Sequence, residues 1–274
     1  MTIVRNIRKV RAAGQKRKKA EMEDRTIVLF GDSHSYAVQR AIEKRKGKNK
    51  PVSVAAHRLL KIKNGKQQGD TSLEEFLEKV RTLGPEDVVL SMIGGNQHAV
   101  YSTIQHPRPF DFLEPGGGPT VAEGVELIPY RALSEFFRTG ISKGDWKSLE
   151  ALRNATPARV VHIIPPPPKG DNEFIQRYHE SLFAREGIAS HGVSSPALRM
   201  KFWKLQTRVL EELCKELDIE VMMPPAATLD GDGFLDKRFF ADDATHGNPM
   251  YGELVLREIE SRYGSEAVTG QVQS

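Results

Sequence analysis

Short apolar runs alternate along this chain with longer stretches in which apolar residues recur every three or four positions. The short runs predict buried strands, because consecutive apolar residues over this length are typical of strands covered on both faces. The longer stretches predict amphipathic helices. The predicted strands span residues 27–30, 52–56, 88–93, 160–164 and 219–222, and the predicted helices span 36–42, 73–83, 130–138 and 146–154, with a long helix from 195 and a last one from 248.

The order of these elements predicts the fold class. Five strands that alternate with helices favour a parallel sheet with helices on both faces, which is an α/β fold. No internal repeat or second apolar core is visible, so we expect one domain over residues 26–264. Residues 1–25 are basic and poor in aromatic residues, so we expect them to be mobile, and we expect residues 265–274 to fray.

The composition agrees with a globular protein. The 274 residues are 39% hydrophobic and 28% charged, and no apolar run reaches the length of a membrane-spanning helix. The single cysteine, Cys214, cannot form an internal disulfide, and the basic N-terminus lacks the apolar region of a secretory signal. We therefore expect a cytoplasmic protein, whose oligomeric state the sequence does not set.

The net charge of +4 conceals an uneven distribution. Residues 1–25 carry nine Lys or Arg and three Asp or Glu, a net charge of +6, and residues 42–66 carry nine against one, a net charge of +8. Such segments could attract an anionic polysaccharide, a membrane surface or a nucleic acid. Basic runs are more often solvated surface, and no nucleic-acid-binding signature accompanies these, so we expect no nucleic-acid partner.

The first predicted strand is followed at once by Gly31, Asp32 and Ser33. In open α/β folds ligands bind at the carboxyl edge of the sheet, where a residue between a strand and the next helix lies. Ser33 therefore has the position of an exposed nucleophile, and the N–H groups at the helix start favour negative charge beside it. The alternative is that Ser33 only caps the helix, as serine often does. This stretch alone leaves both interpretations open.

Two later motifs supply what a nucleophilic serine needs. Asp243 and His246 stand three residues apart before the last helix, and together they can provide a base and the carboxylate that orients it. Asn96 follows two glycines at the end of the strand predicted at 88–93. Its side-chain amide is the kind of donor that stabilises an oxyanion.

These three motifs, in this order, resemble the SGNH hydrolases, also called the GDSL family. The Gly-Asp-Ser block of that family corresponds to 31–33, its Gly-x-Asn block to 94–96 and its Asp-x-x-His block to 243–246. The resemblance implies a flavodoxin-like three-layer α/β/α sandwich with a five-stranded parallel sheet. It also implies that Ser33 is the nucleophile, with His246 as its base and Asp243 as the acid that orients the base.

The resemblance further implies an oxyanion hole made of the Ser33 N–H group, the N–H group of a glycine and the Asn96 amide. The glycine is either Gly65 or Gly69. We favour Gly69, because the residues that follow it are typical of a helix start.

The chain departs from the family at two neighbours of these motifs. Leu often follows Gly-Asp-Ser in the family, and Asp often follows the Asn, whereas this chain has His34 and Gln97 in those places. The departures remove no member of the triad, but they leave the substrate open. We expect the side chains beside the motifs to contact substrate, namely Asp32, His34, Gln97 and His98.

The segment 97–130 is rich in proline and glycine and lacks a regular apolar period. Loops of this length are uncommon unless they are functional or disordered, so the segment is either a wall or lid over the site or a floppy insertion. His98 and His106 are too far apart for a helical metal pair, and residues 230–233 lack the Glu that would close a calcium loop. We expect no metal and no cofactor.

The activity that the resemblance implies is a serine esterase that hydrolyses an acyl ester through an acyl-enzyme on Ser33. A short acyl group such as O-acetyl on a carbohydrate, or a small-molecule ester, is the expected substrate. One alternative is an O-acetyltransferase, because the Gly-Asp-Ser-His form of the motif resembles SGNH domains tied to bacterial polysaccharide O-acetylation. Another is a non-catalytic carbohydrate-binding or regulatory module of the same fold.

Overall fold

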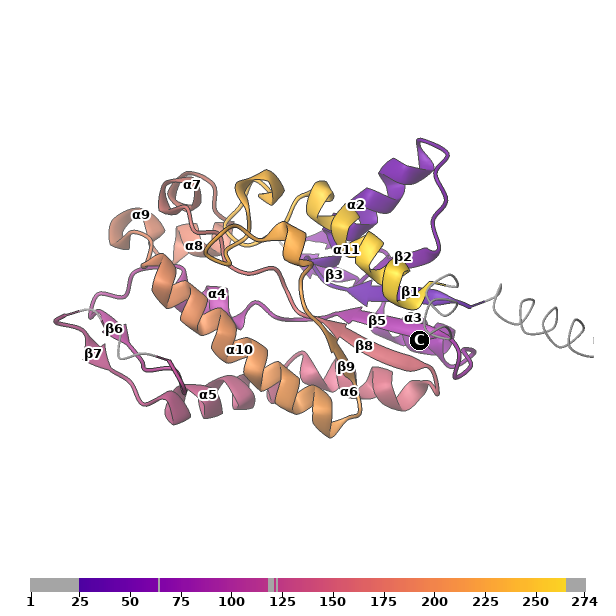
Figure 1. Ribbon diagram of the computed structural model, residues 1–274, viewed down its shortest axis with the longest axis horizontal. Helices are drawn as coiled ribbons and strands as arrows, with labels where there is room; N and C mark the ends of the chain where they lie inside the picture. The colour runs from indigo at the N-terminus through magenta and orange to yellow at the C-terminus, as the bar shows by residue number, and fades with distance from the viewer. Residues whose placement is uncertain (1–24, 64, 118–120, 122, 265–274) are drawn as a thin grey trace, which may run out of the picture.

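A computed structural model describes residues 25–63, 65–117, 121 and 123–264 (Figure 1). Its centre is a five-stranded sheet in which every pair of neighbouring strands is parallel. The strands lie in the order β2-β1-β5-β8-β9, which is the flavodoxin-like order and confirms the predicted α/β fold. They are β1 (Ile27–Gly31), β2 (Val54–Arg58), β5 (Val88–Met92), β8 (Arg159–Ile163) and β9 (Glu220–Met222).

The strand register brings the carboxyl ends of the central strands level with one another. Gly31 at the end of β1 pairs with Arg58 of β2 on one side and with Met92 of β5 on the other. Every residue of β1 and β5 is buried, which explains why these strands appear in the sequence as unbroken apolar runs. Residues that follow β1 and β5 therefore meet at one edge of the sheet, at the point where the strand order reverses.

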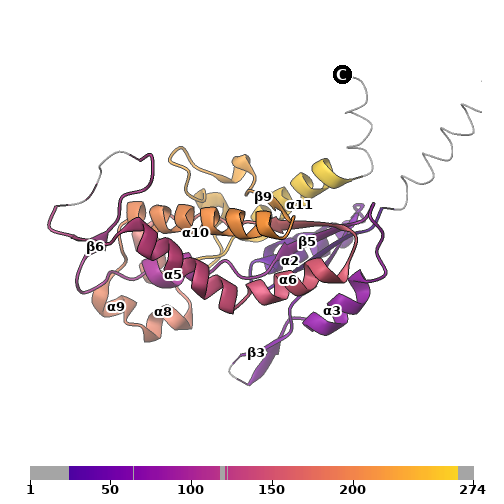
Figure 2. The same ribbon diagram turned by 90° about the horizontal axis from the view of Figure 1, so that it is seen from below.

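Helices cover both faces of the sheet, and alternate strand residues point to opposite layers. Ile27 and Leu29 pack against α2 (Ser35–Lys46) and α11 (Pro249–Tyr263). Val28 and Phe30 pack on the other face, where Figures 1 and 2 show the second helical layer. That layer consists of α3 (Leu73–Val80), α5 (Tyr130–Lys143), α6 (Trp146–Ala155) and α10 (Pro196–Glu216).

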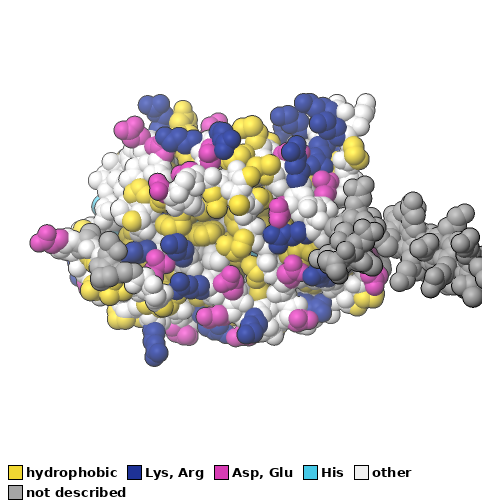
Figure 3. All heavy atoms as spheres, viewed as in Figure 1, with side chains coloured by type: hydrophobic (Ala, Val, Ile, Leu, Met, Phe, Trp, Pro, Cys, Tyr) yellow, Lys and Arg dark blue, Asp and Glu magenta, His cyan; other side chains and the backbone are white. Residues whose placement is uncertain are grey.

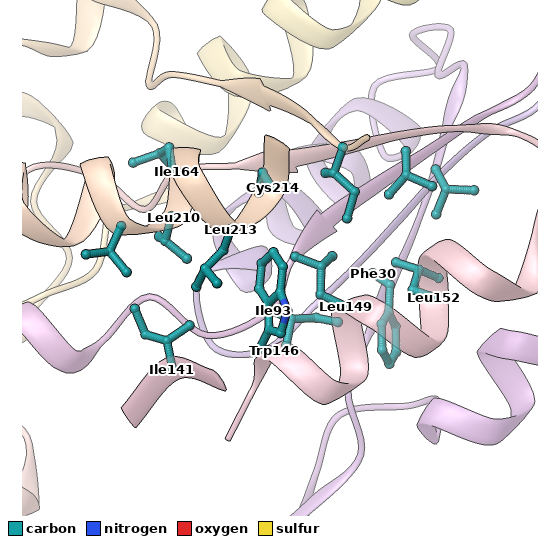
Figure 4. Packing of buried hydrophobic residues seen from close by; sticks show 14 of the residues in the cluster. Phe30, Ile93, Ile141, Trp146, Leu149, Leu152, Ile164, Leu210, Leu213 and Cys214 are labelled. Carbon is teal, nitrogen blue, oxygen red and sulfur yellow. The ribbon is translucent and has the colours of Figure 1, made fainter. Parts of the chain in front are cut away.

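The larger core lies between the sheet and this second layer. Phe30 and Ile93 from the sheet edge meet Trp146 and Leu149 of α6 and Leu213 of α10 (Figure 4). Burial of such side chains contributes about 1.5–3 kcal/mol each, so this layer holds the strand ends firmly in place. The site residues that follow these strands thus start from a rigid base.

Both late helices begin with the capping chemistry that their sequences predict. Ser195 accepts a hydrogen bond from Leu198 N, and Pro196 occupies the first turn of α10. Asn248 accepts hydrogen bonds from Met250 N and Tyr251 N at the start of α11. The second cap sets where the preceding loop, which carries Asp243 and His246, must end.

Several short elements are absent from the sequence-based prediction. A hairpin of β3 (Lys61–Lys63) and β4 (Lys66–Gln68) follows β2 and projects from the body in Figure 2. The segment 165–195 contains α7 (Asn172–Arg177), α8 (Ser181–Arg185) and α9 (Ile188–His191), and the loop after β9 contains η1 (Ala226–Thr228) and η2 (Lys237–Phe239).

The segment 97–130 is not wholly irregular, so that prediction is wrong in part. It contains α4 (Gln97–Ser102) and a two-stranded ribbon of β6 (Phe110–Asp111) and β7 (Glu126–Leu127). Phe112 is fully buried, and its ring lies 5.2 Å from that of Phe202 in α10. Lys201 and Asp111 form an ion pair at 2.8 Å. The described part of this segment is therefore anchored, which contradicts the floppy-insertion alternative.

The predicted mobile and fraying ends fall almost entirely on residues 1–24 and 265–274, which lie outside the described residues. Arg25 is described, and its guanidinium donates a hydrogen bond to Tyr263 O at 3.2 Å. Cys214 is fully buried, and burial raises its pKa to about 12, as suits a core residue. None of the described helices combines the length and the apolar character that crossing a bilayer requires.

The first residues of the basic segment 42–66 form the C-terminal end of α2, where Figure 3 shows Lys and Arg side chains gathered. Several of these cations line a groove of about 490 Å³, together with apolar residues such as Ala41, Phe239 and Leu254. Most of them are exposed, and Arg45 alone forms an ion pair with both Glu253 and Glu260. Both interpretations of this segment, solvated surface and anion binding, remain predictions.

Candidate active site

Ser33 lies in the tight turn that connects β1 to α2. Gly31 permits this turn, because a Cβ atom there would lie 2.7 Å from Met92 Cβ and 2.9 Å from Ser35 Cβ. The N-cap position of α2 is His34, which makes no side-chain capping hydrogen bond, and the helix begins at Ser35. Ser33 is half-buried and does not cap the helix, which removes the capping alternative for this residue.

Asp32 ties the two central strand ends together. Its backbone N–H donates to Met92 O at 3.2 Å, and its carboxylate accepts a hydrogen bond from Gly94 N at 3.0 Å. The residue is only 7% exposed. Groups of the protein therefore contact the Asp32 carboxylate, which was expected to contact substrate. The Lys61 ammonium also lies 3.7 Å from this carboxylate.

Asn96 reaches the same edge from the end of β5. Gly94 and Gly95 have φ of +76° and +94°, and a Cβ atom at either would lie within 3 Å of Asp145 or Pro165. Only glycine suits both positions, and the turn that they make delivers Asn96 to the start of α4. The Asn96 Oδ1 atom lies 2.7 Å from His34 Nε2, so this side chain adjoins the residue next to Ser33.

Asp243 holds His246 by two hydrogen bonds. His246 Nδ1 lies 2.9 Å from Asp243 Oδ2, and the His246 backbone N–H donates to Asp243 Oδ1 at 2.7 Å. With its proton on Nδ1, the ring carries a lone pair on Nε2, which is the arrangement that a general base needs. That Nε2 atom is buried and has no hydrogen-bond partner among the described residues.

The base lies at the strand end that carries Ser33. The ring centroid of His34 lies 4.7 Å from that of His246. His246 Nε2 makes no hydrogen bond to Ser33. Such bonds are often long in free enzymes and tighten when substrate binds.

The charges around this loop favour ionised Asp243. Burial acts to raise the pKa of Asp243, but hydrogen bonds from His246 and the charge of Lys169 outweigh it, so the pKa falls below its ordinary value. The carboxylate is therefore charged at neutral pH. A charged acceptor both fixes the Nδ1–H tautomer of His246 and stabilises the imidazolium that forms when the base takes a proton.

Two residues beside the base escaped sequence reasoning. Lys169 is fully buried, and its ammonium donates to the backbone oxygens of Ala241 and Asp243. Glu180 accepts hydrogen bonds from Ala244 N and Thr245 Oγ1 and lies 3.6 Å from the base Nδ1 atom. Both residues come from the segment between β8 and α10, in which no motif or residue spacing marks a functional position.

The position of Gly69 differs from that of Gly65. Gly69 packs against the backbone of Leu59, whose N–H donates to Gly31 O at 2.7 Å at the end of β1. Gly65 lies at the turn of the β3–β4 hairpin and has open space around it. Gly69 is therefore the glycine beside the sheet edge, and its part in an oxyanion hole remains a prediction.

Of the remaining residues expected to contact substrate, His34 and His98 are buried and Gln97 is half-buried. His98 Nδ1 lies 3.0 Å from Gly95 O, and its backbone N–H donates to Gln206 Oε1 at 2.8 Å. Gln97 lines a cavity of about 10 Å³ together with Asp145, and its Oε1 atom has no hydrogen-bond partner among the described residues. His34 and His98 are each 4% exposed, and burial lowers the pKa of both to about 4.

One group of described residues has donor atoms close enough together to bind a metal ion, within 4.8 Å of one another: Glu180, Asp243 and His246. Both Glu180 oxygens already accept hydrogen bonds from the loop, and both Asp243 oxygens accept hydrogen bonds from it as well. The same atoms therefore serve to hold the loop and orient the base. Hydrogen bonding accounts for the whole group.

Comparison with known protein families gives no match, and neither does comparison with the sequences of curated proteins. Among solved structures, the chain is similar to the periplasmic domain of a lipopolysaccharide acetyltransferase from Salmonella ser. Paratyphi A, with 11% identity, a TM-score of 0.46 and coverage of 87% of this chain and 84% of that one. It is similar to a carbohydrate acetylesterase from Sinorhizobium meliloti, with 12% identity, a TM-score of 0.43 and coverage of 90% and 100%.

A third similar structure is a GDSL-like lipase from Bacteroides thetaiotaomicron, with 13% identity, a TM-score of 0.44 and coverage of 92% of this chain and 97% of that one. The flavodoxin-like sheet of this chain brings the blocks 31–33 and 94–96 to one edge, and the His246 ring lies tilted against that of His34, the residue after the first block. The chain thus shares the fold class and the motif order of the SGNH/GDSL hydrolases.

Proposed function

We propose that this protein cleaves carboxylic esters, with Ser33 as the nucleophile. The observation that carries the proposal is the state of His246 at the carboxyl edge of the sheet. Its Nδ1 atom is held by Asp243, and its Nε2 atom is buried and unpartnered within the described chain, beside the turn that presents Ser33. An imidazole so placed is ready to accept a hydroxyl proton.

The reaction proceeds in two halves. Ser33 Oγ attacks the carbonyl carbon while His246 Nε2 takes the hydroxyl proton, and the imidazolium then gives this proton to the leaving alcohol. Water attacks the resulting acyl-enzyme with the same base, which releases the carboxylic acid and restores Ser33. The N–H groups of Ser33 and Gly69 and the amide of Asn96 stabilise the oxyanion in both halves.

The acyl group that we propose is short, and O-acetyl on a carbohydrate is the first candidate. A series of p-nitrophenyl esters of increasing acyl length, run beside acetylated sugars, tests this directly. We expect the highest kcat/KM with acetate esters. Acetate released from sugars identifies an esterase, whereas transfer of the acetyl group to an added sugar faster than its release identifies an acetyltransferase.

Labelling of the nucleophile provides an independent test. A fluorophosphonate probe reacts covalently with activated serines, and its phosphonyl group occupies the oxyanion hole. We expect peptide mass spectrometry to find the label on Ser33 and nowhere else. Label on another serine, or none at all under conditions in which esters are hydrolysed, would contradict the proposal.

A further inference from the structure

His34 stands next to the proposed nucleophile, yet its ring is turned into the protein. The residue is 4% exposed, so little of it is open to a substrate. Its Nε2 atom lies 2.7 Å from Asn96 Oδ1, and its Nδ1 atom is buried with no partner among the described residues. The single polar contact of the ring therefore runs to the residue expected to stabilise the oxyanion.

The positions of the two ring nitrogens decide where the proton lies. If the proton is on Nε2, it is donated to Asn96 Oδ1, and only a lone pair on Nδ1 lacks a partner. If it is on Nδ1, a buried N–H group is left without an acceptor, which is rare in folded proteins and costs about 1–3 kcal/mol. The Nε2–H tautomer of His34 is therefore favoured, and this tautomer fixes which end of the Asn96 amide faces the ring.

The ring also remains neutral at neutral pH. Burial, followed by the charge of His246, lowers the pKa of His34 to about 4. The titratable groups that act on it are His246, Asp32 and Asp243, and His34 in turn acts on His98. A neutral neighbour 4.7 Å from the base adds no repulsion when His246 becomes an imidazolium.

The backbone of Asn96 is fixed independently from α10. Gln206 Nε2 donates to Gly95 O at 2.8 Å, and Gln206 Oε1 accepts from His98 N at 2.8 Å, so one side chain clamps the turn on both sides of Asn96. The side-chain amide nitrogen of Asn96 has no hydrogen bond to any described residue. With Oδ1 occupied by His34, this N–H₂ group is the free donor.

We propose that His34 is a positioning residue: its Nε2–H holds the Asn96 side-chain oxygen, so that the amide N–H₂ group is directed at the oxyanion beside Ser33. The inference rests on the proposed ester cleavage. It assigns His34 to transition-state stabilisation through Asn96 and not to the binding of substrate.

A double-mutant cycle on p-nitrophenyl acetate tests the proposal. We expect His34→Leu to lower kcat roughly 10- to 100-fold with KM changed less than about twofold. The reason is that a misdirected Asn96 amide no longer stabilises the oxyanion, whose charge develops in the transition state. We expect Asn96→Ala to lower kcat roughly 10²–10³-fold, and the double variant to be no worse than Asn96→Ala alone. His34→Gln, whose amide nitrogen can donate from nearly the same place, should keep most of the activity.

Two results would overturn the inference. Additive losses in the cycle would mean that His34 acts independently of Asn96, and a loss confined to KM would mean that it binds substrate. If Ser33→Ala retains activity, the proposed function fails instead, so the two failures are distinguishable.

A measurement on the wild-type protein keeps the inference testable even if His34→Leu does not fold. Long-range ¹H–¹⁵N NMR correlations of the imidazole report which nitrogen carries the proton. We expect the Nε2–H tautomer of His34 at pH 7, and the ring neutral down to about pH 5. A proton on Nδ1 would contradict the proposal without reference to activity.

Discussion

At the scale of single residues, two carboxylates compete for the role of the acid that orients His246. Asp243 Oδ2 lies 2.9 Å from the base Nδ1 atom, and Glu180 Oε1 lies 3.6 Å from it. The Glu180 oxygens accept hydrogen bonds from Ala244 N and Thr245 Oγ1, whereas Asp243 is hydrogen-bonded to the His246 ring itself. The geometry therefore makes Asp243 the partner of the base and Glu180 a support of the loop.

This assignment predicts unequal losses in two matched variants that each remove one negative charge. Asp243→Asn should lower kcat by about 10⁴-fold, because the ring loses the acceptor that fixes its tautomer. Glu180→Gln keeps an acceptor for the loop and should cost roughly 10- to 100-fold. The measurement is kcat for both variants at saturating ester. Equal losses, or a larger loss for Glu180→Gln, would show that the roles are reversed.

The motif residues could be found from sequence because each follows a recognisable strand or precedes a recognisable helix. Ser33 and Asn96 come directly after buried apolar runs, and Asp243 and His246 precede a capped helix. Lys169 and Glu180 could not be found, since their contacts with the base loop span more than 60 residues. The contact of His34 with Asn96 was out of reach for the same reason.

At the scale of elements, the loop that carries the base is held by the segment that follows β8. Lys169 comes directly after four prolines and is sandwiched between Phe174 and Phe240, each ring centroid 4.9 Å from its ammonium. Burial lowers the pKa of Lys169 to about 8, against the pull of Asp243, so the side chain is mostly charged at pH 7. One buried cation thus joins two loops at the sheet edge.

We expect Lys169→Met to destabilise the protein by about 2–4 kcal/mol, because the backbone oxygen of Asp243 would lose its buried donor. Lys204→Met is the matched control, since Lys204 is exposed and lies 3.9 Å from Glu114. Its cost should stay within about 1 kcal/mol. Chemical denaturation of both variants gives the comparison, and similar midpoints would show that Lys169 does not anchor the loop.

The long elements could be predicted, and the short ones could not. The strands β1 and β5 and the helix α10 show clear apolar patterns, because the two strands are buried over their whole length and the helix along one face. Five of the six residues in β3 and β4 are Lys or Gln, and α9 has only four residues. Such elements owe their structure to neighbouring chain segments, and their own sequence carries little periodic signal.

At the scale of the whole molecule, three buried histidines make stability depend on pH. Burial is the largest cause that lowers the pKa of His34, His98 and His162, each to about 4. His162 lies in β8, and neither of its ring nitrogens has a partner among the described residues. An unfolded chain binds these protons near pH 6.5, whereas the folded chain resists them down to about pH 4.

The sign follows from this difference. Between pH 6.5 and 4 the unfolded state holds more protons than the folded state, so the free energy of unfolding falls as the pH falls. The stability that the neutral histidines contribute is fully present only above about pH 6.5. Each histidine should cost on the order of 2 kcal/mol at pH 5. The measurement is the slope of unfolding free energy against pH, which we expect to be reduced in His162→Gln and unchanged in the exposed control His106→Gln. Equal slopes in all three proteins would contradict the account.

The central claim is that Ser33 is the nucleophile of an ester-cleaving site, and kcat of Ser33→Ala on the best p-nitrophenyl ester tests it most directly. The variant removes one hydroxyl group from a half-buried turn, so the melting temperature should stay close to that of the wild type. We expect kcat to fall by about 10⁴-fold or more, as when a triad nucleophile is lost. A folded Ser33→Ala protein that turns over ester at nearly the wild-type rate would contradict the account.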